Sequence, residues 1–166
     1  SLEGDSDWNA CIGKQSHAEN YVDGYMEAAL ALVSAVIDQR KLGARDTLAM
    51  PILYNGRHAL ELSLKFAVDQ LHGAGVLAEA AQSNHDIKLH WNALVAGSIG
   101  DAELRRILTD LAPYVESLHA IDEDGQQLRY AKTREGDQSV ADKAICNLEL
   151  VRESLRAMGA LLGRLK

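Results

Sequence analysis

The chain has 166 residues, of which 47% are apolar, 25% are charged and only 5% are aromatic. That length suits one continuous core, so we expect a single domain over residues 1–166, with residues 1–15 disordered or partly a remnant of cloning. The excess of 24 acidic over 17 basic residues, a net charge of −7, argues against the broad positive surface that binds duplex DNA.

The sequence disfavours membrane and secreted proteins. No apolar run approaches the roughly 20 residues of a membrane-spanning helix, and no basic stretch followed by an apolar segment indicates a secretory signal. Cys11 and Cys146 are too few for a disulfide framework or a structural zinc site. We therefore expect a cytoplasmic protein with no membrane association, no metal and no cofactor.

Helical periodicity predicts an all-α protein, because apolar residues recur every three or four positions among abundant Ala, Leu, Glu and Arg. A first helix is expected over 16–43, where Ser16 and Glu19 have the spacing of a capping box. A second is expected over 46–73, with Pro51 in its first turn. Its apolar residues make it the expected central helix.

The next segments predict two more helices. Residues 76–82 are expected to add a short helical turn. The third helix, over 83–97, is expected to be capped by its first or second residue, and the fourth, over 101–118, by Asp101.

The helical period disappears over residues 122–138, which predicts one long polar connection, a kind of segment that often carries functional residues. A last helix is expected from Ser139. Its apolar residues alternate by three and four without a break, as in a heptad seam. This stripe either packs along antiparallel helices of the same bundle or contributes to a homodimer interface.

Three charged residues of the second helix, Arg57, Glu61 and Lys65, follow one another at intervals of four and so share one face. His58 lies about 100° from Arg57 around the helix axis, so both could border the same groove. The charged row is either a set of solvated ion pairs or the edge of a functional cleft.

His85 and His90 are separated by five positions, which places them about 140° apart on a helix and disfavours a shared metal ion. Asp86 and His90 are four apart, so the carboxylate could orient the imidazole. A carboxylate at a helix start also stabilises the helix dipole. The acidic run 122–124 lacks the spacing of a calcium loop, and the sequence has no Gly-rich phosphate loop and no nucleophile elbow.

One pattern combines three segments: Arg57–Lys65, His85–Ile87 and Arg129–Tyr130. In order and spacing it resembles the HEPN superfamily. In that family a helix reading roughly Ala-x-Glu-x-x-Leu-Lys-Ala is followed by a helix that opens with His-Asp-Leu, and later by Arg-Tyr-Pro. The resemblance covers about residues 48–132, and Ala131 stands where the family has Pro.

The resemblance implies an up-and-down bundle of about five helices that forms a homodimer. It also implies a polar groove, for which the ligand-binding candidates are Arg57, Glu61, Lys65, Asp86, Arg129 and Tyr130. In this groove Tyr130 could stack on a base while Arg129 contacts a phosphate. Alternatively, Tyr130 packs back on the bundle and Arg129 pairs with an acid.

The expected function, again by resemblance, is a non-catalytic binding or regulatory module in a defence, toxin–antitoxin or RNA-related system. Its partner would be a protein such as a nucleotidyltransferase, a nucleotide or single-stranded RNA. Nuclease members of the family carry an Arg followed four to six residues later by a His, and this chain has no such pair. The alternatives are a metal-independent ribonuclease with a relocated site, built from Arg129, His58 and His85, and a structural dimerisation domain.

Overall fold

The computed structural model of the chain describes residues 4–10, 13, 17–122 and 145–166. Within these ranges it has no strand and five α-helices: α1 (Ala18–Asp38), α2 (Arg45–Gly73), α3 (Ile87–Gly97), α4 (Ala102–Ile121) and α5 (Leu148–Leu165). Two short 3₁₀ turns, η1 and η2, span Ser6–Trp8 and Leu42–Ala44. The prediction of an all-α protein with about five helices is confirmed.

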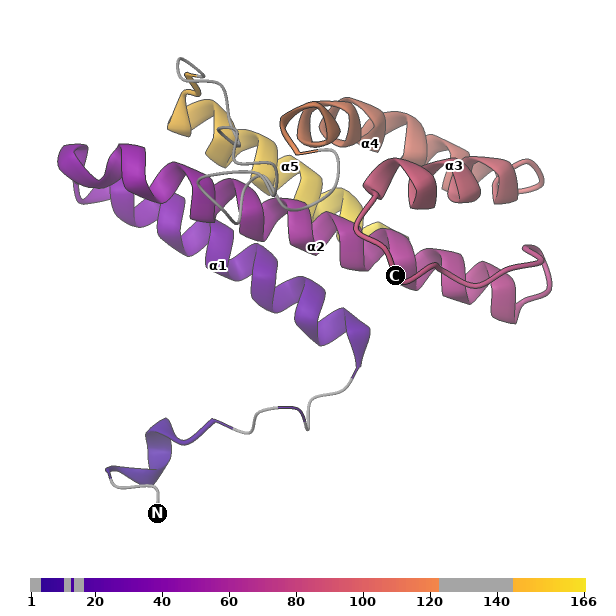
Figure 1. Ribbon diagram of the computed structural model, residues 1–166, viewed down its shortest axis with the longest axis horizontal. Helices are drawn as coiled ribbons and strands as arrows, with labels where there is room; N and C mark the ends of the chain where they lie inside the picture. Colours follow the sequence, from indigo (N-terminus) through magenta and orange to yellow (C-terminus); the bar gives the residue numbers. More distant parts are fainter. Residues whose placement is uncertain (1–3, 11–12, 14–16, 123–144) are drawn as a thin grey trace, which may run out of the picture.

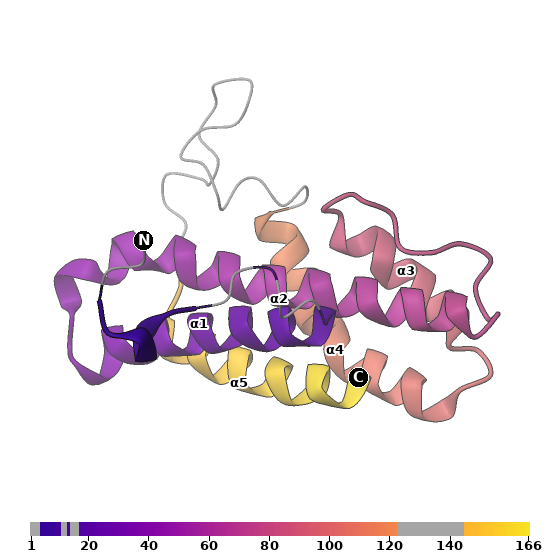
Figure 2. The same ribbon diagram turned by 90° about the horizontal axis from the view of Figure 1, so that it is seen from below.

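Helix α2 is the centre of the bundle, as its apolar residues predicted. Helix α1 runs antiparallel to α2, and α5 packs against both of them (Figures 1 and 2). Helix α3 lies beside the C-terminal half of α2 and also contacts α4. Because α2 contacts all four other helices, many of its side chains are enclosed by protein.

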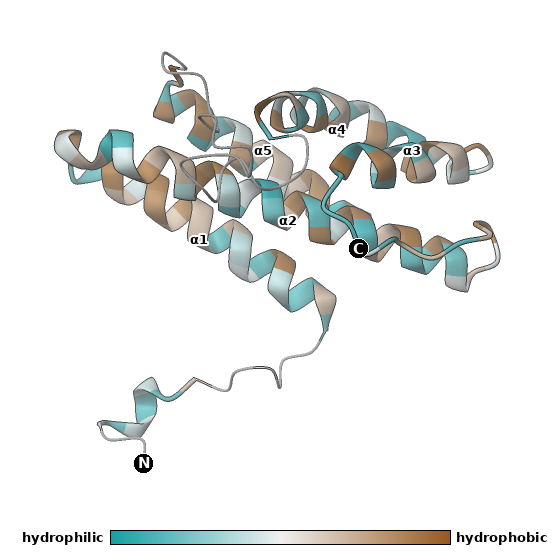
Figure 3. Ribbon diagram, in the orientation of Figure 1, coloured by the Kyte–Doolittle hydropathy of each residue, from teal (hydrophilic) through white to brown (hydrophobic). Residues whose placement is uncertain are grey.

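The core consists mainly of aliphatic side chains from all five helices. Figure 3 shows hydrophobic and hydrophilic residues alternating along the helices, as expected for helices that bury one face. Fully buried examples come from each helix: Val33, Leu60, Leu94, Leu111 and Leu162. No helix in the described part of the chain is long and apolar enough to cross a bilayer.

The apolar stripe of α5 packs inside this bundle. Leu155, Met158 and Leu162 are only 4%, 1% and 2% exposed. Gly56 of α2 lies so close to Leu155 that a Cβ at Gly56 would come within 2.5 Å of the leucine Cδ2 atom. Of the two interpretations of the stripe, packing within the bundle is therefore confirmed for these residues. A homodimer stays a prediction.

The end of α1 differs from the prediction, because the helix stops before Gly43. Arg40 adopts the left-handed conformation, with φ of 50°, and its N–H donates to the carbonyl of Ile37. The next residue, Lys41, donates to the carbonyl of Val36 at 2.9 Å. These two hydrogen bonds form a Schellman motif, in which Arg40 occupies the position that glycine usually takes.

Both helix starts in this half of the chain also differ. Helix α1 begins at Ala18 with His17 at its cap position, and no side chain caps it. Ser16, the expected cap, lies outside the described residues. Helix α2 begins at Arg45, so Pro51 is its seventh residue and lies beyond the first turn.

Three predicted features of the second half of the chain are wrong. Residues 76–82 do not form a helical turn, and α3 is capped by Asp86. Residues 145–147 are not helical, and the Asn147 side chain caps α5, so the last helix does not run unbroken from Ser139. Asp101 caps α4 as expected.

Candidate functional site

Arg57 and Glu61 lie inside the bundle. Their side chains are 2% and 1% exposed, and the helix that carries them is in contact with α3 and α4. A row of solvated ion pairs is therefore the wrong interpretation for these two residues. Lys65, with 20% of its side chain exposed, lies at the edge of the row. Buried charged groups require partners, and the surrounding structure provides them.

The guanidinium of Arg57 joins three parts of the chain. Its Nη2 donates to the carbonyl of His85 at 2.7 Å, and its Nε donates to the carbonyl of Asp122 at 3.0 Å. Its Nη1 donates to the carboxylate of Glu61 at 3.2 Å. Because His85 precedes α3 and Asp122 follows α4, one planar group with several donors fixes both segments to α2.

Glu61 is the common acceptor of this network. Its Oε1 accepts hydrogen bonds from Lys65 Nζ at 2.8 Å and from His85 Nδ1 at 2.9 Å. His58 Nδ1 lies 3.8 Å from Oε2. We call the whole group the Glu61 cluster: Arg57, His58, Glu61, Lys65, His85 and Asp122. Within the described ranges, no group of three or more His, Cys, Asp or Glu side chains is placed to hold a metal ion.

The Glu61 carboxylate is ionised at neutral pH. Burial alone would raise its pKa, but the nearby His58 ring, the N–H groups of Lys65 and His85 and the positive charge of Lys65 outweigh burial and hold the pKa well below the ordinary value of 4.5. The cluster thus has a fixed negative charge at its centre, surrounded by donors.

Lys65 and His85 form the exposed edge of the Glu61 cluster. The His85 side chain is 39% exposed, and its Nδ1 faces a carboxylate, which only accepts. We therefore assign the hydrogen to Nδ1, which leaves Nε2 as an acceptor. Because Arg57 holds the backbone of His85 and Glu61 holds its ring, the imidazole is fixed in orientation beside an ammonium group.

His58 connects this cluster to two tyrosines that the sequence analysis missed. Its ring meets the Tyr25 ring edge-on at 4.4 Å between centroids and stacks on Tyr54 at 5.7 Å, with the planes 10° apart. A usable signal was present in the sequence. Tyr54, His58, Glu61 and Lys65 follow one another at intervals of four, three and four, which places all of them on one face of α2.

Asp86 acts as the cap of α3. Its Oδ1 accepts the backbone N–H of Lys88 at 2.9 Å and that of Leu89 at 3.3 Å. Among the described residues no hydrogen bond joins Asp86 to His90. The interpretation of Asp86 as a residue that stabilises the helix start is therefore confirmed, and a ligand-binding role for it stays a prediction.

We expect Asp86→Ala to lower the free energy of unfolding by about 1 kcal/mol, because two N–H groups lose their acceptor. Asp86→Asn keeps an acceptor and should retain most of the stability. Urea denaturation followed by circular dichroism measures both. Equal stability of the alanine variant and the unmodified protein would contradict the capping role.

His90 lies on α3, where it is 2% exposed and its Nε2 has no hydrogen-bond partner among the described residues. Burial lowers the pKa of His90 from its ordinary value of 6.5, despite the opposing effects of the Asn84 backbone and the Glu61 carboxylate. The folded protein therefore favours the neutral imidazole.

This burial predicts a pH dependence of stability. As the pH falls through 6.5, His90 becomes protonated in the unfolded chain but stays neutral in the folded protein. The free energy of unfolding should therefore fall by up to about 1.4 kcal/mol per pH unit. Urea denaturation at pH 7.5, 6.5 and 5.5 measures the effect. His90→Gln should show a shallower fall, and identical slopes for the two proteins would refute the assignment to His90.

Arg129 and Tyr130 lie outside the described residues, as does most of the predicted connection over 122–138. Asp122, the last described residue before it, is fully buried and bound to Arg57. The chain therefore enters the segment that carries Arg129 and Tyr130 at the Glu61 cluster.

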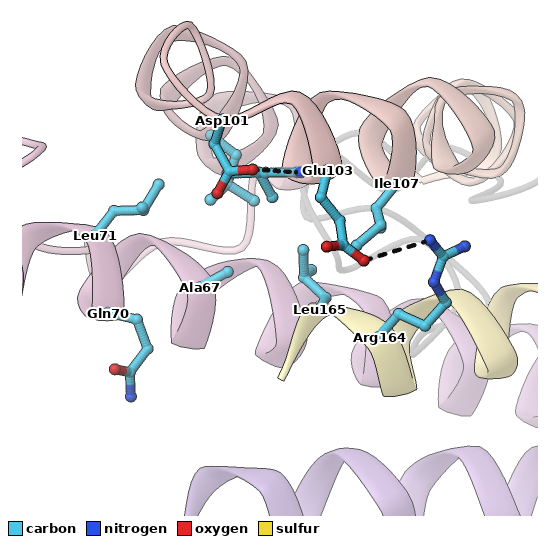
Figure 4. Close-up of a pocket in the computed structure, with 10 residues that line it drawn as sticks. Ala67, Gln70, Leu71, Asp101, Glu103, Ile107, Arg164 and Leu165 are labelled. Atoms are coloured by element: carbon cyan, nitrogen blue, oxygen red, sulfur yellow. Dashed lines mark hydrogen bonds and ion pairs between the residues drawn. The ribbon is translucent and has the colours of Figure 1, made fainter.

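A separate cavity of about 300 Å³ lies between α2, α4 and the end of α5. Figure 4 shows Glu103 and Arg164 facing each other, with 3.9 Å between their charged groups, and Asp101 hydrogen-bonded to its own helix. No residue of the Glu61 cluster lines this cavity. Since these three charged groups already have partners, we assign no ligand to it.

Comparisons of the chain with protein-family models, with curated proteins and with solved structures found no match. The resemblance to HEPN thus rests on the three sequence segments that suggested it, and it stays a prediction.

Proposed function

We propose that the chain is a HEPN-like, non-catalytic binding module that engages a phosphate group of single-stranded RNA or of a nucleotide through the Lys65 ammonium, at the exposed edge formed by Lys65 and His85. The supporting observation is that both side chains are held over the buried Glu61 carboxylate, at 2.8 Å and 2.9 Å. An ammonium group has three donors, so Lys65 keeps donors for a ligand after binding Glu61.

The position of this edge supports the proposal further. Lys65 lies on α2 and His85 in the segment before α3, and Arg57 binds both Glu61 and the backbone of His85. A preformed pair of this kind needs little ordering when a ligand binds. The resemblance to HEPN supplies the setting, a toxin–antitoxin, defence or RNA-related system, and a homodimer as the working form.

The test is a mobility-shift assay with a mixture of single-stranded and structured RNA in EDTA, in which RNA cleavage is followed in parallel. We expect a shift without cleavage. Lys65→Ala should weaken binding about tenfold, the effect of one charge-assisted hydrogen bond. Lys88→Ala is the matched control, because Lys88 pairs with Glu116 and not with Glu61. Absence of any shift would reject RNA as the ligand and favour a protein partner.

The second candidate is the metal-independent ribonuclease. The contact between Glu61 and His85 favours it, because a carboxylate that orients an imidazole leaves Nε2 available to take a proton from a ribose 2′-OH. In the same assay this candidate requires cleavage that persists in EDTA and is lost in His85→Gln. Cleavage with these properties would replace the binding proposal.

A further inference from the structure

Aromatic residues are concentrated beside the Glu61 cluster. The whole chain has two Trp, five Tyr and one Phe, so aromatic side chains are scarce. Two of the five tyrosines, Tyr25 and Tyr54, contact His58 directly. A third, Tyr21, precedes Tyr25 by four residues on α1, which places it on the same side of that helix, and it is 42% exposed.

These rings are not fully enclosed by the core. Tyr25, Tyr54 and His58 are only partly buried, whereas nearby aliphatic residues of α2, such as Ile52 and Leu60, are completely buried. Helix α1 diverges from α2 toward its N-terminal end, which is the end that carries Tyr21 and Tyr25 (Figure 1). Tyr21 and Tyr25 therefore belong to the part of α1 that leads toward its diverging end.

His58 has a second unusual feature. Its Nδ1 atom is buried and has no hydrogen-bond partner among the described residues. Glu61 Oε2 lies 3.8 Å from this atom, beyond hydrogen-bond distance. A buried polar atom without a partner is uncommon in folded proteins and calls for a physical explanation. The imidazole contacts the rings of Tyr25 and Tyr54.

We propose that Tyr21, Tyr25 and His58 form a subsite that stacks a nucleobase next to the phosphate-binding edge of Lys65 and His85. This inference rests on the proposed function and extends it from the phosphate of the ligand to its nucleobase. Aromatic rings stack on any nucleobase because every base has a π-face, so the subsite accepts single-stranded RNA with little sequence preference. His58 and Lys65 are seven residues apart on α2, or about 10 Å along its axis.

The experiment compares two ligands that share a backbone: an adenosine pentanucleotide RNA and an abasic pentamer of the same ribose phosphate chain. Isothermal titration measures the affinity of each for the full chain. We expect the pentanucleotide to bind about tenfold more tightly, which is within the range of one stacked base. Lys65→Ala should weaken both ligands by the same factor.

Substitutions of the tyrosines test where the nucleobase binds. Tyr21→Leu changes an exposed ring and Tyr25→Leu a partly buried one, and each should bring the two affinities close together. Tyr25→Phe keeps the ring and should keep the preference. Tyr114→Leu is the matched control, because Tyr114 is also partly buried but lies on α4, where it lines a pocket with Leu53 of α2 and residues of α5. Thermal unfolding of each variant shows that it remains folded.

The outcomes separate the two proposals. Equal affinity for the two ligands, with binding lost in Lys65→Ala, would overturn the stacking subsite and leave the phosphate-binding function standing. A preference for the base that survives both Tyr21→Leu and Tyr25→Leu would also overturn the subsite. Failure of both ligands to bind would overturn the proposed function and the subsite together.

Discussion

Arg57→Ala is expected to lower the free energy of unfolding by about 3–5 kcal/mol, the usual cost of removing one partner of a buried ion pair. The substitution takes the positive charge away from the Glu61 carboxylate, which is 1% exposed. It also removes the donor that holds the carbonyls of His85 and Asp122. Urea denaturation followed by far-UV circular dichroism measures the change.

Two variants control this experiment. Arg45→Ala removes an arginine from the same helix, but its side chain is 60% exposed, so the change should stay within about 0.5 kcal/mol. The double variant Arg57→Met/Glu61→Leu removes both charges and should be more stable than the sum of the single losses predicts. A loss below about 1 kcal/mol in Arg57→Ala would show that the network does not hold the fold together.

Leu155→Glu is expected to unfold the protein or to lower the free energy of unfolding by more than about 3 kcal/mol, because it places a carboxylate in an apolar core. Leu155 is 4% exposed and lies against Gly56 of the central helix. Denaturation by urea and size-exclusion chromatography together distinguish loss of the fold from loss of a dimer.

Leu150→Glu is the matched control on the same helix. Leu150 is 63% exposed, so the substitution should change stability by no more than about 0.5 kcal/mol. A folded, monomeric Leu155→Glu variant, obtained from a dimeric protein, would contradict the packing of this residue inside one bundle. It would favour the structural dimerisation domain over the binding module.

The sequence predicted the approximate positions of the helices better than the residues at which they begin and end. Helices α1, α2 and α4 were expected close to their observed positions, because apolar periodicity extends over many residues. The ends depend on single hydrogen bonds. At the end of α1, Arg40 takes a conformation that is usually reserved for glycine, and at the start of α3 the cap is Asp86. No pattern in the sequence distinguishes Arg40 from its polar neighbours, and Asp86 was one of several polar residues that could cap α3.

The candidate site was predicted in part. The spacing of Arg57, Glu61 and Lys65 correctly placed the three side chains on one face of α2, and the structure joins them through the Glu61 carboxylate. The contact of His85 with Glu61 spans 24 residues, and that of Arg57 with Asp122 spans 65. Periodicity within one helix carries no information about contacts at such separations.

Local chemistry of the chain is enough to specify five helices, a long central helix, the face on which its charged residues lie and an apolar stripe on the last helix. Each of these properties depends on residues three or four positions apart, which a regular helix brings together wherever it lies. Burial is different, because it depends on which other segments cover a face. Only the packing of α3 and the end of α4 against α2 makes Arg57 and Glu61 interior residues and leaves Lys65 and His85 at the surface.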